Sequence, residues 1–270
     1  MNVREVLAEI YRRNRVLALA GWFNLLLLVL MFCVAPFDAR TVLGLNLWIK
    51  PMKFAVSFTV YLWTLAWLLS YLPRYPRMVR LISWGSAIVA VGEMFCIVSQ
   101  AARGVKSHFN FATPYDSMIF TVMGLLIIFN TLLVALVLLL FFLRTAALPP
   151  AYLWGIRFGL LLFLLASLEG YAMISHGAHT IGMADGGPGL PFVNWSTRAG
   201  DLRAAHFLGF HALQLLPLAG YAVSRHQGHA TRGQRVALVS ALAVVYLATF
   251  SALFWQAMNG RPLLNLGAIF

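Results

Sequence analysis

A carboxylate and two histidines lie close together where a long apolar segment ends. Glu169 follows the apolar stretch GLLLFLLASL, and His176 and His179 come within the next ten residues. At about 100° per residue, positions seven apart lie on nearly the same face of a helix, so Glu169 and His176 share a face. Carboxylates and imidazoles can transfer protons or ligate metal ions, and imidazole also ligates haem iron. This segment is therefore the first candidate for chemistry.

The same pattern occurs a second time. EMFCIVSQAARG, which begins at Glu93, and EGYAMISHGAHT, which begins at Glu169, both fit E-x5-S-[QH]-[AG]-A-[RH]. Downstream, NFATPYD ends at Asp116 and NWSTRAGD ends at Asp201, and a glycine follows each aspartate by eight residues. We infer a repeated helix hairpin, with a partial third copy at QAMNG. Copies related by an axis along the membrane normal place equivalent residues around one site.

We expect these residues to line one outward-facing polar pocket, because a charged side chain that faces lipid is costly. Five positions separate His206 from His211, about 140° around a helix, so only one of the two can face the pocket. As a structural alternative, Glu93 and Glu169 could be ion-pair partners of Arg103, Lys106 or Arg203. The candidate catalytic residues are Glu93 and Glu169, and the candidate cofactor-binding residues are His176, His179, His206, His211, Lys50, Lys53, Arg103 and Arg203.

Haem b is the first cofactor to consider for such a pocket. Its iron takes one or two imidazoles, which the four candidate histidines can supply. Its propionates need cationic partners, and lysines and arginines cluster at the same end of the spans. The sequence thus favours a haem b (or related redox cofactor) binding membrane oxidoreductase or electron-transfer protein, with a quinone or a periplasmic protein as redox partner.

Two other functions remain open. A non-haem metal-dependent enzyme, hydrolase or oxidoreductase, could act at the outer leaflet with an iron, copper or zinc ion. Neither H-E-x-x-H nor H-x-x-x-H occurs in the sequence. The second alternative is a small-solute or metal-ion transporter, which ranks lower because inner-half segments such as FTVYLWTLAWLL offer few polar groups to line a path. The metal ligands would be chosen from Glu93, Glu169, His176, His206 and His211.

The elements that must position these residues are membrane spans. The chain is 61% hydrophobic and 10% charged, whereas a soluble domain is roughly 25% charged. Seven apolar runs reach or approach the 20 or so residues that cross a bilayer as a helix. We predict an all-α integral membrane protein, a seven-transmembrane-helix bundle that forms a single domain over 16–270. A basic, amphipathic segment, 1–15, precedes it, and the outer loop 177–202 is a candidate lid. The spans are expected near 16–36, 53–72, 81–100, 117–143, 151–176, 203–223 and 237–258.

The basic residues predict the orientation. With a cytoplasmic N-terminus, eleven of the 20 lysines and arginines fall on the inner side and eight on the outer side, while Arg157 lies within a span. This asymmetry agrees with the positive-inside rule. We therefore expect a bacterial inner-membrane protein with a periplasmic C-terminus, and we interpret the net charge of +12 as a topology signal with no nucleic-acid partner. Cys33 and Cys96 both lie in spans and predict no disulfide framework.

Overall fold

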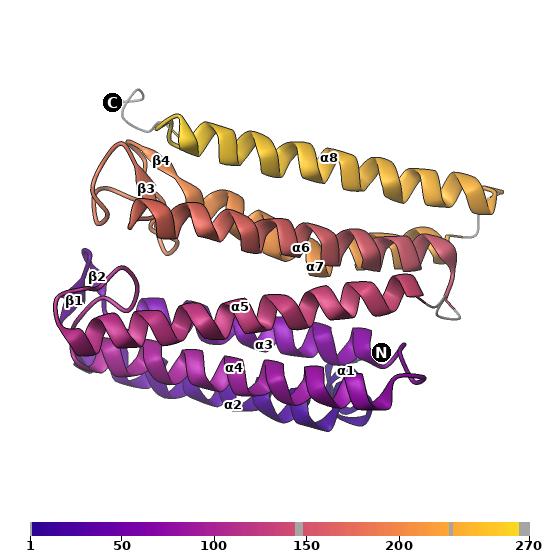
Figure 1. The fold of residues 1–270 in the computed structure, drawn as a ribbon, viewed down its shortest axis with the longest axis horizontal. Coiled ribbons are helices and arrows are strands. Elements are labelled where there is room, and N and C mark those ends of the chain that lie inside the picture. The colour runs from indigo at the N-terminus through magenta and orange to yellow at the C-terminus, as the bar shows by residue number, and fades with distance from the viewer. Residues whose placement is uncertain (1, 144–147, 227–228, 265–270) are drawn as a thin grey trace. The chain divides into compact units, whose positions relative to one another are not determined.

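The structure is a computed structural model that describes residues 2–143, 148–226 and 229–264. Within these ranges the chain is predominantly helical, as the sequence predicts (Figure 1). The α-helices are α1 (Val3–Arg13), α2 (Arg15–Val34), α3 (Ile49–Leu69), α4 (Pro76–Ala102), α5 (Pro114–Leu143), α6 (Pro150–His176), α7 (Leu202–Arg225) and α8 (Arg232–Met258).

Short irregular elements connect some of these helices. A single turn of 3-10 helix, Ala35–Phe37, follows α2. Two antiparallel pairs of two-residue strands occur in the described residues. One pair lies in the segment between α2 and α3, and the other in the segment between α6 and α7. The pairs are β1 (Thr41–Val42) with β2 (Leu45–Asn46), and β3 (Thr180–Ile181) with β4 (Gly200–Asp201).

The seven helices α2 to α8 confirm the predicted membrane spans. Each is long and apolar enough to cross a bilayer, and the ends differ from the predicted spans by at most five residues. Large apolar side chains on these helices are exposed, among them Leu125, Leu132 and Val244. Such exposure over whole helices is unfavourable in water and is expected against lipid tails. The chain is a helical integral membrane protein that contacts the lipid bilayer.

The amphipathic N-terminal segment forms a separate helix, α1. Asn2 and Glu5 form a reciprocal capping box at its start, which satisfies two of the unpaired N–H groups there. Asn14 ends α1 and at the same time caps α2, because its side chain accepts a hydrogen bond from the N–H of Leu17. The chain therefore breaks between the predicted surface segment and the first span.

The chain divides into two compact units, and the boundary falls within α5, between Val137 and Leu138. The first unit holds α1 to α4 and most of α5, and in it α2 packs against α3 and α4. In this unit the β1–β2 hairpin lies at one end of the long helices and α1 at the other (Figure 1). The hydroxyl of Tyr61 on α3 donates to Asn130 on α5 at 2.9 Å, an interhelical bond of the kind expected between spans.

The second unit holds the end of α5 together with α6, α7 and α8, and its closest packing joins α6 to α7. A side chain added at Gly159 would place its Cβ 2.7 Å from the carbonyl oxygen of Ala212, and one at Gly220 would meet the carbonyl of Ala151 at 2.6 Å. A Cβ at Gly155 would lie closer still to the backbone of α7, beside the carbonyl oxygen of Leu216. Small residues four apart on α6 thus bring two backbones into contact, which is a common way for membrane helices to associate.

Candidate functional site

The principal polar contact of the second unit joins Glu169 on α6 to His206 on α7. The Nδ1 of His206 lies 2.8 Å from Oε2 of Glu169. The carboxylate side chain is 3% exposed and the imidazole 26% exposed. Close packing of α6 on α7 accounts for the proximity, because Glu169 lies in the last two turns of α6 and His206 in the second turn of α7. The result is a buried acid in contact with a partly accessible imidazole.

The surroundings of this pair restrict its hydrogen bonding. Oε1 of Glu169 is buried and has no hydrogen-bond partner among the described residues. The ring centroids of Phe210 and His206 lie 4.2 Å apart, and those of Phe163 and Phe210 lie 4.6 Å apart, with the rings tilted in both pairs. An ionised carboxylate only accepts hydrogen bonds, so with Glu169 ionised Nδ1 of His206 carries the hydrogen, and in the neutral imidazole Nε2 then keeps its lone pair.

The remaining candidate histidine of α7 is placed differently. The His211 ring lies 4.1 Å from the ring of Phe207. Its Nδ1 is buried without a hydrogen-bond partner in the part of the chain that the structure describes. Of the two histidines that the helical angle separates, His206 is the one that contacts the carboxylate.

His176 is exposed at the end of α6. Its Nδ1 lies 2.9 Å from the carbonyl oxygen of Ala172, one turn earlier in the same helix. Gly177 then ends α6 in a left-handed conformation with φ 64°. His176 is therefore hydrogen-bonded to its own helix rather than to Glu169.

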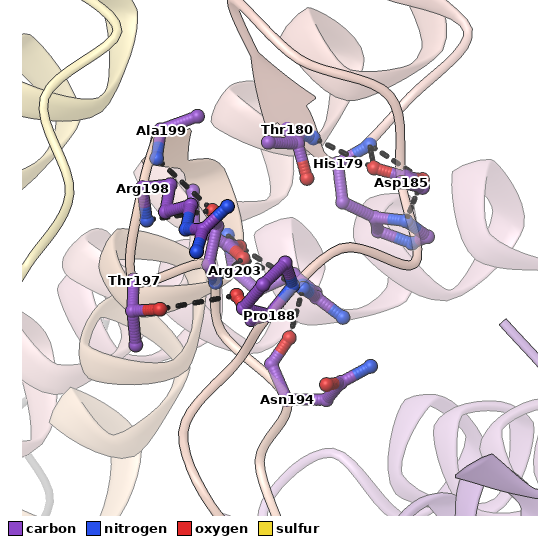
Figure 2. Close-up of polar contacts among 11 residues, drawn as sticks. His179, Thr180, Asp185, Pro188, Asn194, Thr197, Arg198, Ala199 and Arg203 are labelled. Carbon is purple, nitrogen blue, oxygen red and sulfur yellow. Dashed lines mark hydrogen bonds and ion pairs between the residues drawn. The ribbon is translucent and has the colours of Figure 1, made fainter. Parts of the chain in front are cut away.

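His179 lies in the loop between α6 and α7 and binds a second carboxylate (Figure 2). Its Nδ1 is 2.7 Å from Oδ2 of Asp185. The backbone N–H groups of His179 and Thr180 also donate to Asp185, at 3.0 to 3.2 Å. Burial alone would raise the pKa of Asp185, but hydrogen bonds from His179 and Thr180 and electrostatic attraction to His179 hold that pKa well below its ordinary range.

The other end of this loop is held by an arginine (Figure 2). Arg203 makes an ion pair of 2.6 Å with the buried Asp201 and donates to the carbonyl of Asn194 at 2.5 Å. Asp201 also caps α7 and accepts from the N–H of Ser196. The predicted lid is thus a folded loop closed by β3 and β4. Asp185 and Asp201, which hold it, are not among the site residues predicted from sequence, although Asp201 ends a repeated motif.

In the first unit, the repeat leads to a related arrangement. Asp116 in the first turn of α5 accepts hydrogen bonds from Gln100 at 2.9 Å and from Arg103 at 2.6 Å. In both units, therefore, the aspartate that ends the repeated motif lies at the start of a helix and pairs with an arginine. Arg103 and Arg203, which the sequence suggested as alternative ion-pair partners of Glu93 and Glu169, are paired with these aspartates.

Glu93 is buried on α4, with 1% of its surface exposed, and its Oε1 has no hydrogen-bond partner among the described residues. Lys50 and Lys53 lie in the first two turns of α3, half-buried. No group of three or more histidine, cysteine, aspartate or glutamate side chains is arranged to hold a metal ion within the described ranges. The convergence of Glu93 and Glu169 on one pocket stays a prediction.

The chain was compared with known proteins. No protein-family model matches it, and no curated protein and no solved structure matches it either. The class of protein therefore follows from the helices themselves: an integral membrane protein with seven candidate spans among the described residues.

Proposed function

We propose that this membrane protein binds haem b through His206 and acts as an oxidoreductase or electron-transfer protein. The observation that carries the proposal is the hydrogen bond between His206 and Glu169. Histidines that ligate metals commonly donate their other ring N–H to a carboxylate or carbonyl, which fixes the tautomer and makes the ligating nitrogen more basic. With Glu169 ionised, His206 has this arrangement.

The neighbours of His206 fit a porphyrin ligand. Phe210 supplies flat apolar surface beside the imidazole, the buried Phe163 packs against Phe210, and a quarter of the imidazole is exposed. Haem iron held by protein imidazoles exchanges single electrons when bound. The residues of this chain would hold and orient the iron ligand, and the buried carboxylate would tune its basicity.

His179 is the second candidate ligand, because Asp185 holds its Nδ1 as Glu169 holds that of His206. Among the cations predicted to bind propionates, Arg203 is engaged by Asp201 and Asn194. Lys50, Lys53 and Arg103 belong to the first unit, where Arg103 is engaged by Asp116, and their role as propionate partners stays a prediction from the sequence.

The proposed location is the bacterial inner membrane, with the N-terminus in the cytoplasm. This orientation rests on the distribution of arginines and lysines and on the positive-inside rule. It places the Glu169–His206 pair and the loop that follows α6 toward the periplasm. A quinone in the bilayer or a periplasmic redox protein would then exchange electrons at this end.

An absorption spectrum of the detergent-purified protein, oxidised and then reduced with dithionite, tests the proposal. We expect a Soret band and sharpened α and β bands on reduction. His206→Ala should abolish them, whereas His226→Ala, a change at an exposed histidine at the opposite end of α7, should leave them unchanged. Glu169→Gln should retain haem and raise its midpoint potential, because a negative charge near the ligand favours ferric iron. Protein absorption alone would refute the proposal for the protein as purified.

One observation favours a non-haem metal site as the second candidate. The free Oε1 of Glu169 lies beside an imidazole, and carboxylate and imidazole together suit iron, zinc or copper. Elemental analysis of the purified protein distinguishes the two. A stoichiometric metal without a Soret band, lost in both Glu169→Gln and His206→Ala, would favour this alternative.

A further inference from the structure

A basic pocket lies in the first unit at the end of the helices that carries α1. Its volume is about 450 Å³. It is formed where α1 ends, α2 begins, α3 ends and α4 begins, which is the end opposite the β1–β2 hairpin (Figure 1). Its lining combines cationic and apolar side chains and includes Arg13, Arg15, Ser70, Leu72, Arg80 and Trp84.

Hydrogen bonds between helices hold the walls in place. The Asn14 side chain donates to Ser83 on α4 at 2.6 Å and so ties the start of α2 to α4. Arg13 donates to the hydroxyl of Ser70 at 2.5 Å, and its guanidinium lies 3.9 Å above the ring of Trp67. The pocket is therefore built by contacts among four helices rather than by a mobile loop.

The pocket has the electrostatics of an anion site. Of the described residues, three arginines and no carboxylate line it; Glu9, which is not part of the lining, binds Arg12 and Arg13. Arg15 and Arg80 are exposed. The N-terminal ends of α2 and α4, helices of 20 and 27 residues, both reach the pocket. Each carries a partial positive charge from its aligned peptide dipoles.

We propose that this pocket binds the phosphodiester headgroup of an anionic phospholipid. Its cations meet the phosphate, and its apolar residues continue into the lipid-facing surface of the spans. Trp84, which is 55% exposed, suits the boundary between headgroups and acyl chains. Basic pockets between membrane helices are suited to anionic headgroups. A free phosphate ion would use the same cations and would gain nothing from the apolar rim.

Two double variants of equal charge test the site. Arg15→Gln/Arg80→Gln removes two lining cations. Arg74→Gln/Arg77→Gln removes two exposed cations from the same end that do not line the pocket. Delipidated full-length protein is titrated with phosphatidylglycerol, with phosphatidylcholine, and with phosphatidylglycerol in the presence of millimolar inorganic phosphate, and bound lipid is counted by native mass spectrometry.

We expect the wild type to retain phosphatidylglycerol in preference to phosphatidylcholine. The affinity should fall about tenfold or more in Arg15→Gln/Arg80→Gln, and less than threefold in Arg74→Gln/Arg77→Gln, since both pairs contribute equally to diffuse attraction. Circular dichroism confirms that both variants are folded. Equal losses in the two variants, or no preference between the lipids, would overturn the proposal. Full displacement by inorganic phosphate would reassign the pocket to a soluble anion.

Discussion

Oε2 of Glu169 and Nδ1 of His206 lie 2.8 Å apart across the interface of α6 and α7. The carboxylate is almost fully buried, and one of its oxygens has no other partner in the described chain. A buried carboxylate depends on its hydrogen-bond partners to offset the cost of desolvation. The contact therefore links the stability of the second unit to the group that we propose binds the cofactor.

We expect His206→Ala to lower the stability of the protein by about 1–3 kcal/mol, the usual cost of an unsatisfied buried acceptor. Adding Glu169→Leu to His206→Ala should restore part of the loss, because it removes the carboxylate left without a partner. Thermal unfolding in detergent, followed for the wild type, both single variants and the double variant, measures the coupling. Strictly additive effects would show that the two side chains do not interact.

The loop between α6 and α7 should lose order in acid because of Asp185. Burial raises the pKa of Asp185, but the hydrogen bonds and charge of its neighbours lower it by more. The pKa is therefore held below its ordinary value. A carboxyl with a depressed pKa in the folded state stabilises that state above the unfolded pKa of about 3.9, and this contribution is lost as pH falls toward the folded pKa. Hydrogen exchange of the loop peptide, corrected for intrinsic rates, should therefore accelerate below about pH 4.

Asp185→Asn provides the matched control for this loop. The neutral amide cannot replace a charge-assisted acceptor, so we expect exchange at neutral pH to be about tenfold faster than in the wild type. The acceleration in acid should also be much weaker in the variant. An identical pH profile in the two proteins would contradict the role of Asp185.

The close contact of α6 with α7 should make Gly159 intolerant of a side chain. We expect Gly159→Leu to cost at least 1–3 kcal/mol, about the usual penalty for overpacking, because its Cβ would meet the backbone of Ala212. Gly124→Ala is the control, since a Cβ at Gly124 meets nothing within 4 Å. It should be neutral or stabilise α5 by about 0.5–1 kcal/mol. Unfolding midpoints in detergent compare the two, and equal destabilisation would argue against tight α6–α7 packing.

Single-cysteine labelling tests the proposed orientation. In a background with Cys33→Ser and Cys96→Ala, Ala112→Cys should react with a membrane-impermeant maleimide added outside intact cells. Ala230→Cys, before α8, should react only after permeabilisation. Both positions are exposed and outside the helices. The reverse pattern would place the Glu169 end in the cytoplasm and withdraw the periplasmic partner from the proposal.

Short-range features of the chain made much of the fold predictable. Apolar runs of span length determine the membrane helices, because a helix is the element that satisfies its own backbone in hydrocarbon. The basic, amphipathic residues before Arg15 likewise predict the separate helix α1. The repeated motif predicts related loops, and Asp116 and Asp201 do occupy related positions at the starts of α5 and α7.

Tertiary structure decided which side chains are partners across helices and within the loop between α6 and α7. Angular spacing separates His206 from His211 but does not identify which of them contacts Glu169, because that depends on how α7 is rotated against the glycines of α6. Asp185 meets His179 because the loop turns back on itself. Hydropathy and periodicity describe one helix at a time, and so the sequence alone determined the spans. The neighbours of each polar side chain follow from packing between segments far apart in the chain.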